Sequence, residues 1–441
     1  MPAFRAPRGT RDLLPQDQLA ISRLRAIGDE LASRYGYLPI STPLFEQVGV
    51  FERGIGEVTD VVEKELFLIA PRDEDGSERW ALRPEPTAGI VRAYVQHGMQ
   101  TWPQPVKLTM SAEMFRYDRP QAGRYRSFWQ FDVEAIGDPG PAIDAEIIEL
   151  ADRFYRTVGI TGHRILLNSI GDAACRPAYV EELTAYYRKH ERELPPLERA
   201  RLERNPLRIL DSKDASVAGL NAAAPRITER LCDACAAHFA AVRAHLDALG
   251  VAYVLEPALV RGLDYYTRTA FEVYPGGATG QQSAIGGGGR YDGLVELLGG
   301  RPTPGIGFGL GLDRILLALR EAGGGSAGAI DAPPPSPVAV VVGSDPEDTV
   351  TRLRLATDLR AAGLAARAEL GKRKLGKQLE AAARDGAHFS VIVGDELAAG
   401  QVQLRDLEAG TQRAVPVETL ARDLERATRT HRHGPAAAGE A

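Results

Sequence analysis

The chain has 441 residues, of which 44% are apolar and 25% charged, and its formal net charge is −6. This composition predicts a folded protein of two or three domains and excludes wholesale disorder. No apolar run approaches the roughly 18 residues of a membrane span, and the start has no apolar core of signal-peptide type. Because three cysteines cannot form a disulfide framework, we expect a cytoplasmic protein without membrane attachment. The acidic total argues against general coating of nucleic acid but allows local basic patches.

The long N-terminal part, residues 1–320, is expected to be an α+β domain with an antiparallel sheet. Residues 19–35 have the pattern of an amphipathic helix, and residues 37–43 are extended. Several later strands are joined by short turns, which favours an antiparallel sheet with helices. Residues 173–249 are almost wholly helical and rich in Arg, Glu and Ala, so we expect a helical insertion there.

Residues 110–134 are predicted to form a hairpin that turns at residues 120–123. Side chains alternate between two faces of its second strand. The largely apolar face carries Tyr125, Ser127, Trp129, Phe131 and Val133. The other face carries Arg126, Phe128, Gln130, Asp132 and Glu134. Such a polar face is either solvated or lines a site, and this segment alone leaves both open.

The only metal-like spacing is Cys232-Asp-Ala-Cys235 with His238. There is no second cysteine pair, and the segment has a helical pattern. Buried free thiols are common, so we expect structural cysteines and no tightly bound metal. The eight histidines lie outside the other candidate segments, so the sequence offers no candidate histidine for acid–base catalysis.

Two short segments place charged and aromatic side chains in loops. Residues 82–87, LRPEPT, hold Glu85 between two prolines, and residues 260–267, VRGLDYYT, combine Arg261 with two tyrosines. Arginine can bind carboxylate or phosphate, and a phenol can hydrogen-bond a polar ring. Taken alone, residues 260–267 fit an ordinary surface turn better than a binding site, and residues 82–87 are also compatible with an ordinary loop that carries a solvated acid.

Four glycines alternate with apolar residues in the segment 305–314, GIGFGLGLDR. One face of this strand therefore lacks side chains, which indicates the close approach of a flat ring or of a packed helix. Arg314 follows at the start of a helix, where its guanidinium could stack on such a ring. The glycines fit no dinucleotide fingerprint, and residues 286–289 are followed by Arg290 rather than the Lys-Ser/Thr of a P-loop.

Residues 321–336 are rich in Gly, Ser and Pro and are predicted to link a second domain, residues 337–426. Strand and helix patterns alternate in this domain, which predicts parallel βαβ units. The expected strands are 338–342, 388–393 and 402–407, and the expected helices are 345–362, 374–384 and 417–426. The tail, residues 427–441, is expected to be frayed.

Together these segments resemble class II aminoacyl-tRNA synthetases, and most closely the histidyl-tRNA synthetase family. Residues 33–43 are similar to motif 1, the hairpin to motif 2, and residues 305–316 to motif 3. Residues 260–267 and residues 283–295, SAIGGGGRYDGLV, are similar to two signatures specific to the histidine enzymes. The resemblance covers nearly the whole chain. It implies a homodimeric aminoacyl-tRNA ligase with a class II catalytic domain and a C-terminal anticodon-binding α/β domain.

The resemblance also implies a reaction and its residues. ATP would activate L-histidine as an adenylate with release of pyrophosphate, and tRNA(His) would then accept the histidyl group. Arg116 and Arg261 would be the catalytic arginines at the α-phosphate, and Phe128 and Arg314 would hold the adenine with Arg116 nearby. The implied histidine-binding residues are Glu85, Thr87, Arg116, Gln130, Glu134, Arg261, Tyr265 and Tyr266. Glu134 and Tyr266 would bind the imidazole, and the segment Arg290–Asp292 would complete that side of the cleft.

This chemistry needs charge neutralisation rather than a base. An amino-acid carboxylate, with a pKa of roughly 3.5, is already ionised at neutral pH. Fixed arginines can stabilise the charge that builds on the α-phosphate. Mg²⁺ is expected to accompany ATP. The clustered lysines Lys372, Lys374 and Lys377 are expected to contact tRNA phosphates.

Three residues depart from the family pattern. Pro86 stands where the family often has Gly, Asp118 replaces a usual Glu, and Trp129 stands where many members carry His. None removes a group that the chemistry requires. The alternative function is a non-catalytic, synthetase-like regulatory subunit of ATP phosphoribosyltransferase. Such a subunit typically lacks the anticodon domain and catalytic residues, whereas this chain has both, including Arg116.

Overall fold

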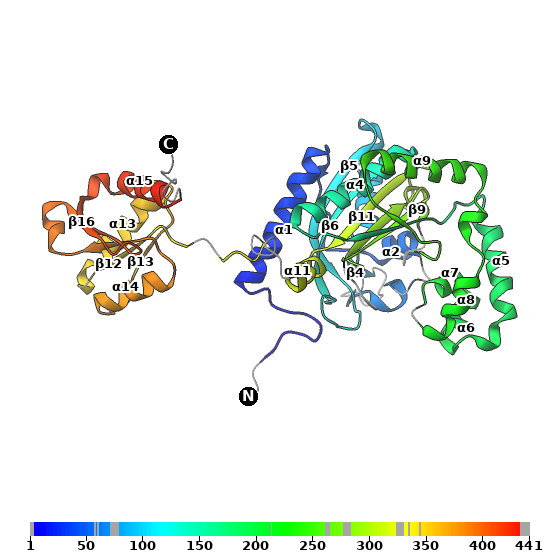
Figure 1. The fold of residues 1–441 in the computed structure, drawn as a ribbon, viewed down its shortest axis with the longest axis horizontal. Coiled ribbons are helices and arrows are strands. Elements are labelled where there is room, and N and C mark those ends of the chain that lie inside the picture. Colours follow the sequence, from blue (N-terminus) through cyan, green and yellow to red (C-terminus); the bar gives the residue numbers. More distant parts are fainter. Residues whose placement is uncertain are drawn as a thin grey trace, which may run out of the picture. The chain divides into compact units, whose positions relative to one another are not determined.

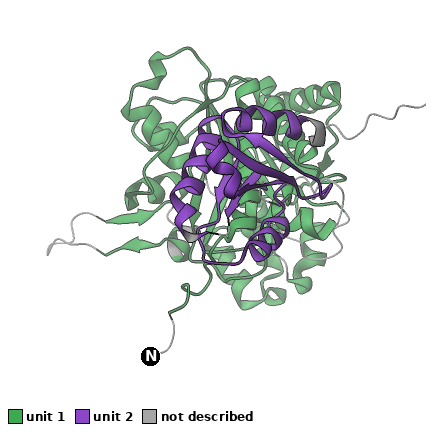
Figure 2. Cartoon of the chain, turned by 90° about the vertical axis from the view of Figure 1, so that its left-hand side faces the viewer, with its two compact units in different colours: residues 1–332 green, residues 333–441 purple. Residues whose placement is uncertain are grey.

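The computed structural model of the chain (Figure 1) forms two compact units, residues 1–332 and 333–441 (Figure 2). No helix in the described part of the chain is long and apolar enough to cross a membrane. Arg261 and the last nine residues of the expected tail, 433–441, lie outside the described residues. The structure describes residues 4–56, 59, 61–70, 79–212, 214–260, 265–276, 284–322, 330–333, 336–343 and 345–432.

An eight-stranded sheet forms the centre of the first unit (Figure 1). Its strands, in order across the sheet, are β1 (Leu38–Pro39), β5 (Val106–Phe115), β6 (Ser127–Ile136), β11 (Gly305–Gly311), β10 (Gly286–Arg290), β9 (Thr267–Tyr274), β7 (Arg164–Ser169) and β8 (Val254–Leu255). The six inner strands pair antiparallel, and only the edge strands β1 and β8 pair parallel. The predicted antiparallel sheet and the hairpin formed by β5 and β6 are therefore confirmed.

Four helices form an apolar layer with one face of this sheet. They are α1 (Pro15–Arg34), α4 (Pro141–Val158), α9 (Asp233–Leu249) and α11 (Leu312–Ala322). Phe131 of β6 and Phe308 of β11 are buried in this layer, and their rings meet edge to face with centroids 5.6 Å apart. α1 packs close because Gly28 has no side chain, and a Cβ there would lie 3.0 Å from the Phe131 ring. The predicted first helix and the core-facing side of β6 are thus confirmed.

A small sheet and three helices border the opposite side. They are β2 (Phe45–Gln47), β4 (Trp80–Leu82), β3 (Leu68–Ile69), α2 (Val48–Ile55), α3 (Thr87–Gln96) and α10 (Leu294–Leu297). Their buried side chains form a second apolar cluster, which includes Phe51, Tyr94 and Leu294. Because this cluster borders the polar face of β6, that face does not look into open solvent.

The helices expected in the insertion, residues 173–249, divide into two groups. The first group is α5 (Arg176–Lys189), α6 (Pro196–Arg204), α7 (Leu207–Leu210) and α8 (Ala218–Ala223). These helices lie together at one side of the unit, away from α1 (Figure 1), and bury Tyr179, Leu183 and Tyr187 in a cluster of their own. In contrast, α9 packs against α4 and contributes to the main core. By packing, α9 belongs to the helical layer of the sheet.

The second unit is a five-stranded sheet with helices. Its strands, in order, are β13 (Ala366–Ala368), β12 (Ala339–Gly343), β14 (Phe389–Val393), β15 (Gln401–Asp406) and β16 (Gln412–Pro416), and its helices are α13 (Thr349–Ala361), α14 (Leu375–Arg384) and α15 (Leu420–Arg432). β12 and β14 pair parallel, as predicted from the intervening helices. The expectation of parallel pairing is wrong for the third predicted strand, because β15 pairs antiparallel with β14. Only the short 3₁₀ turn Asp395–Ala399 joins these strands, and a parallel crossover needs a longer connection.

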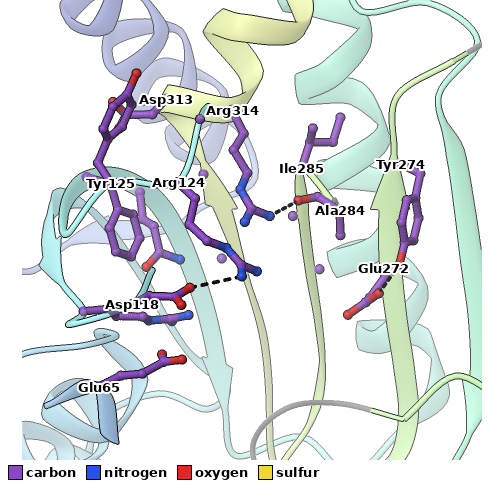
Figure 3. A pocket seen from close by; sticks show the side chains of 18 of the residues that line it. Glu65, Asp118, Arg124, Tyr125, Glu272, Tyr274, Ala284, Ile285, Asp313 and Arg314 are labelled. Carbon is purple, nitrogen blue, oxygen red and sulfur yellow. Dashed lines mark hydrogen bonds and ion pairs between the residues drawn. The ribbon is translucent and has the colours of Figure 1, made fainter. Parts of the chain in front are cut away.

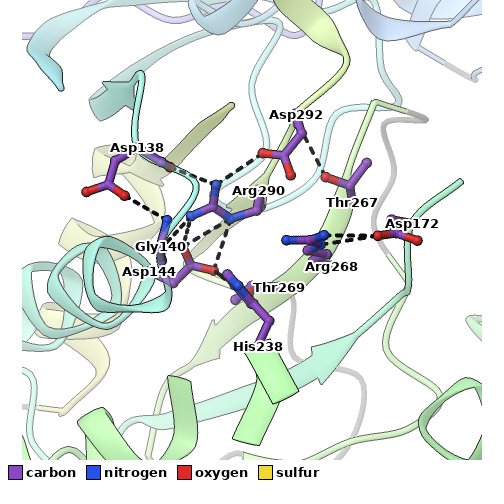
Figure 4. A network of polar contacts seen from close by, with 10 residues as sticks. All are labelled: Asp138, Gly140, Asp144, Asp172, His238, Thr267, Arg268, Thr269, Arg290 and Asp292. Carbon is purple, nitrogen blue, oxygen red and sulfur yellow. Dashed lines mark hydrogen bonds and ion pairs between the residues drawn. The ribbon is translucent and has the colours of Figure 1, made fainter. Parts of the chain in front are cut away.

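A buried ionic network joins four elements of the first unit (Figure 4). Asp144, in the first turn of α4, accepts hydrogen bonds from Arg290 of β10, from His238 of α9 at 2.8 Å and from Thr269 of β9 at 2.5 Å. Arg290 and Asp144 are fully buried. Burial alone would raise the pKa of Asp144, but the hydrogen bonds from His238 and Arg290 outweigh it and hold the pKa below its usual value. The network therefore fixes β10 against α4.

We expect Arg290→Met to destabilise the first unit by about 3–5 kcal/mol, because it leaves the Asp144 carboxylate buried without its main cation. Calorimetric thermal unfolding measures this loss. Arg34→Met is the control, because Arg34 pairs with Glu30 at the surface, where ion pairs contribute little. Equal midpoints for the two variants would contradict a stabilising role of the network.

Candidate functional site

Two connected cavities lie on the polar side of the central strands. The larger, of about 380 Å³, is the arginine cavity, and Arg116 is among the residues that line it. Arg124 and Arg314 also line this cavity (Figure 3). The smaller, of about 60 Å³, is the acid pocket, lined among others by Glu85 and Glu134. Both cavities share part of their lining, namely Arg116, Gln130, Gly287 and Gly309. A ligand with a cationic part and an anionic part can therefore extend from one cavity into the other.

The acid pocket is formed by the polar face of β6. Gln130, Asp132 and Glu134 are buried and line it, so this face lines a site rather than meeting solvent. Glu134 accepts hydrogen bonds from the Thr87 hydroxyl at 2.6 Å and from the Tyr291 hydroxyl at 2.5 Å. Burial raises the pKa of Glu134 to about 8, although these two hydrogen bonds act in the opposite direction.

Two further acidic side chains, Glu85 and Asp132, line the pocket beside Glu134. Glu85 accepts the backbone N–H groups of Thr87 and Ala88, each at 2.8 Å, and so stabilises the start of α3. Burial raises the pKa of Glu85 above its usual value despite these bonds. The pKa of Asp132 is raised well above its usual value by burial and then by Glu134 and Glu85. A cation in the pocket would relieve this clustering.

Two buried acceptor atoms in the pocket lack a donor. Within the described part of the chain, no group donates a hydrogen bond to Gln130 Oε1 or to Asp132 Oδ2. Buried polar atoms are normally hydrogen-bonded, so such atoms in a cavity call for a ligand or water. Acceptors of this kind suit an ammonium group, which has three donors.

Aromatic side chains form the far wall of the acid pocket. Tyr265 and Tyr266 are buried, with ring centroids 4.6 Å apart, and the Tyr265 ring stands edge-on to Tyr291 at 5.9 Å. The Tyr266 carbonyl accepts a hydrogen bond from Arg176 at 2.6 Å. This wall supplies phenol hydroxyls beside a flat surface, which fits a polar aromatic ring.

Four guanidinium groups, those of Arg116, Arg124, Arg208 and Arg314, line the arginine cavity together with five acidic side chains. Arg116 donates to the Pro84 carbonyl at 2.8 Å, and its guanidinium lies 5.5 Å from the centre of the Phe128 ring. Arg314 donates to the Ala284 carbonyl at 2.5 Å (Figure 3). Burial, and then Arg124 and Arg116, lower the pKa of Arg314 to about 10, so it remains charged at neutral pH. Clustered guanidinium groups of this kind suit phosphate.

The glycines of β11 make room for the protein's own site residues. A Cβ at Gly305 would collide with the Tyr291 ring, and one at Gly307 with the Glu134 carboxylate. At Gly309 it would lie 2.5 Å from Gln130 Nε2. The alternative of close packing by a helix is therefore wrong, because strand and loop residues fill this space. Gly309 and Gly311 at the end of β11 line the arginine cavity, and at Gly311, where a Cβ would meet only Arg314, the strand is open to a ligand ring.

The structure brings most of the expected site residues together. Those lining the acid pocket are Glu85, Thr87, Arg116, Gln130, Glu134, Tyr265 and Tyr266. Arg116, Phe128 and Arg314 line the arginine cavity. Arg261 lies outside the described residues. Among the described residues, Arg290 and Asp292 line neither of these two cavities, and Arg290 is bound by the buried Asp144, so the expectation that they complete the cleft does not hold for the part of it that the structure describes.

Other lining residues were missed or misplaced by the sequence patterns. Tyr125 was assigned to the apolar face but lines the arginine cavity, because β6 begins only at Ser127. Glu272 of β9 also lines the arginine cavity. Alternation along the strand could have predicted that Glu272 shares a face with Ala270, but not that this face lies near β11. Arg208 comes from α7 in the helical segment, and no local signal relates it to the cavity.

Comparison with known proteins agrees with both units. A family profile described as "Histidyl-tRNA synthetase" matches residues 9–315, and one described as "Anticodon binding domain" matches residues 337–426. The expected class II catalytic fold and C-terminal α/β domain are thereby confirmed.

Individual proteins are similar over almost the full chain. The histidine–tRNA ligase of Moorella thermoacetica is 47% identical over 418 residues, covering 94% of this chain and 96% of that protein. That of Desulforudis audaxviator is 47% identical over 425 residues, covering 95% and 98%. The crystal structure of apo S. aureus histidyl-tRNA synthetase has a TM-score of 0.77 at 34% identity, covering 96% of this chain and 100% of that one. This chain therefore belongs to the histidyl-tRNA synthetase family.

Proposed function

We propose that the chain attaches L-histidine to tRNA(His), using ATP and forming histidyl-adenylate with release of pyrophosphate. The observation that carries this proposal is the junction of the two cavities. Gln130 Oε1 and Asp132 Oδ2, which accept no hydrogen bond from any described residue, lie on one side, and the cluster of guanidinium groups lies on the other. An amino acid whose ammonium group enters the acid pocket would present its carboxylate at Arg116, where the phosphates of ATP would lie.

The acid pocket would bind histidine by complementary hydrogen bonds. Glu85, Thr87 and Gln130 would hold the ammonium group, with Asp132 supplying a further acceptor. Glu134 and Tyr266 would bind the two imidazole nitrogens, and Tyr265 would line the ring. The Tyr291 hydroxyl, which donates to Glu134 at 2.5 Å, would keep that carboxylate in place. A pocket whose polar groups hydrogen-bond to a polar ring disfavours an apolar side chain, because those buried groups would then lack hydrogen-bond partners.

Arginines would supply the transition-state stabilisation. The histidine carboxylate attacks the α-phosphate, the bond to the β-phosphate oxygen breaks, and pyrophosphate leaves. Arg116, which lines both cavities, would neutralise the α-phosphate, and we assign Arg261 to the same task. Removing one preorganised donor of this kind typically costs roughly 10²–10³-fold in rate. No general base is needed, because the carboxylate is already ionised.

ATP would lie in the arginine cavity. Phe128 and Arg314 would hold the adenine, and the bare strand end at Gly311 would give a ring access to the backbone. Mg²⁺ usually binds one or two carboxylates together with phosphates. Glu272 lines the cavity and accepts a hydrogen bond from Tyr274 at 2.8 Å, so it is a suitable protein ligand for an ATP-bound magnesium ion.

We further propose that the protein works in the cytoplasm as a homodimer and binds tRNA through its second unit. Lys372, Lys374 and Lys377 are exposed at the start of α14. The side-chain amide of Gln378 donates to the carbonyls of Gly343 and Arg373, which fixes this loop near the end of β12. The regulatory-subunit alternative is disfavoured, because such a subunit would need neither the clustered arginines nor this second unit.

We expect ATP–pyrophosphate exchange that depends on histidine. The acid pocket offers paired polar groups to an imidazole, so proline, threonine and glycine should not support exchange. Isotope exchange between pyrophosphate and ATP, measured with each amino acid in turn, gives the answer. Exchange that another amino acid stimulates equally well, or that needs no amino acid, would refute the proposed function.

Neutralising the three lysines together (Lys372→Gln, Lys374→Gln, Lys377→Gln) should raise the KM for tRNA and leave pyrophosphate exchange unchanged. Each lost phosphate contact should also reduce the salt dependence of tRNA binding by about one unit of slope. Charging assays over a series of salt concentrations measure both effects. Arg422→Gln, on an exposed position of the same unit, is the matched control. An unchanged KM would exclude these lysines from the tRNA interface.

Glu134→Gln should flatten the dependence of stability on pH. The pKa of Glu134 is about 8 in the fold, above its unfolded value of 4.5, so the folded state binds the extra proton. Stability from this group is fully present below pH 4.5 and is lost as the pH rises towards 8. Thermal midpoints at pH 5 and pH 8 should therefore differ more for the wild type than for Glu134→Gln. The exposed Glu30→Gln is the control, and identical pH dependence in all three proteins would contradict the raised pKa.

A further inference from the structure

All three cysteines of the chain meet at one point, together with a carboxylate. Asp172 and Cys175 lie just before α5, and Cys232 and Cys235 lie at the start of α9. Their ligand atoms, three sulfurs and one carboxylate oxygen, all lie within 4.8 Å of one another. Cys175 and Cys235 are buried, with exposed fractions of 6% and 1%. The two pairs are remote in sequence, so this convergence is a property of the fold.

The spacing of these atoms fits a tetrahedral metal ion. Cys175 Sγ lies 3.7 Å from Asp172 Oδ1. Ligands about 2.0–2.3 Å from a tetrahedral ion are separated by about 3.5–3.8 Å. Gly171 permits this approach, because its φ of +65° forms the turn and a Cβ there would lie 2.8 Å from Cys175 Sγ. The backbone is therefore shaped to place Asp172 and Cys175 together.

We propose that Asp172, Cys175, Cys232 and Cys235 bind a structural zinc ion. Three thiolates and one carboxylate complete a closed four-coordinate shell, which leaves no position for a reacting water and suits Zn²⁺ better than oxygen-preferring Mg²⁺ or Ca²⁺. Binding releases the three thiol protons to solvent and involves no change of oxidation state. The expectation of no tightly bound metal rested on the lack of a second cysteine pair, and in the fold Asp172 and Cys175 supply a second pair of candidate ligands instead.

Groups around the cluster support a carboxylate ligand. Arg268 donates to Asp172 Oδ2 at 3.1 Å (Figure 4), and the backbone N–H of Ala174 donates to Oδ1 at 3.0 Å. Outer partners of this kind orient metal-binding carboxylates. Cys175 and Cys232 each hold the position that precedes the first turn of a helix, where the positive end of the helix favours a thiolate. His238 takes no part, because it contacts Asp144.

A redox-active dithiol is the rival interpretation. Hydrogen bonds from Cys235 lower the pKa of Cys232, and burial raises that of Cys235, a difference also found in CxxC redox pairs. A dithiol pair, however, requires neither a third thiol nor a carboxylate at the same point. The four-way convergence therefore favours a metal ion.

Zinc would fix the place where the helical segment leaves and rejoins the sheet. Asp172 follows β7, and Cys232 and Cys235 begin α9, which packs on α4. Close by, Arg176 donates to the carbonyls of Ile170 and Tyr266, and Tyr266 lines the acid pocket. The ion would thus brace one wall of this pocket without taking part in the reaction.

The wild-type full-length chain tests the proposal directly. Purified without chelators, it should contain about one zinc per chain by plasma mass spectrometry. Because every cysteine belongs to the cluster, a thiol reagent reports on this site alone. We expect the native thiols to react at least about tenfold more slowly than after zinc removal by a chelator. A reduced chain that holds no zinc, takes up none when zinc is added and has three reactive thiols would overturn the proposal, as would a metal-free Cys232–Cys235 disulfide.

Variants identify the ligands. Cys175→Ser and Cys235→Ser should lose zinc, and Asp172→Ala should weaken zinc affinity at least about tenfold. Asp172→Cys should retain zinc and release it to a coloured chelator more slowly, because a fourth thiolate replaces the carboxylate. Asp233→Asn, an exposed change inside the same CxxC segment, is the control and should keep zinc. Unchanged affinity in Asp172→Ala would exclude the carboxylate as a ligand and so overturn the four-ligand site.

Discussion

The site depends on one steric constraint, which is that β11 has no side chains on the face it shares with the polar residues of β6. Glu134 occupies the space above Gly307. Gln130 and Asp132 occupy the space beside Gly309. A Cβ at either glycine would displace these side chains. Burying ionisable groups is costly, and here Thr87 and Tyr291 offset part of that cost for Glu134. The raised pKa of Glu134 reflects the part of the burial cost that these hydrogen bonds do not offset.

The glycine strands need support from behind, and the Asp144 network provides it. A Cβ at Gly288 of β10 would lie 2.0 Å from the carbonyl oxygen of Gly307, so Gly288 could carry no side chain there. Arg290 ends β10 and is held by Asp144, whose other partners come from α9 and β9. The next residue, Tyr291, then points its hydroxyl at Glu134. Two adjacent residues therefore serve different groups: Arg290 binds the buried Asp144, and Tyr291 binds Glu134 of the acid pocket.

Local periodicity explains which parts could be predicted. The two faces of β6 follow from a period of two, and the parallel pairing of β12 with β14 follows from the intervening helices. Arg290 was misassigned because its neighbour Tyr291 does line the pocket, and no pattern distinguishes an arginine that faces a buried Asp144 from one that faces a ligand. β15 was misassigned because its pairing depends on the length of one connection. The convergence of Cys175 with Cys232 joins two segments that are remote in sequence, and single-segment spacing cannot reveal it.

Net charge says little about this molecule because charges are segregated over short distances. The formal charge of −6 does not reveal that a pocket lined by buried acidic side chains lies next to a cavity lined by several arginines. The two cavities share Arg116, which therefore lies between the buried acidic side chains of one cavity and the other arginines of the second. In the proposed function, this arrangement would orient an amino acid before any reaction, with its ammonium group towards Asp132 and its carboxylate towards Arg116. Because that carboxylate is ionised already, orientation and charge neutralisation are the contributions the protein needs to make, and fixed side chains on a rigid sheet are suited to both.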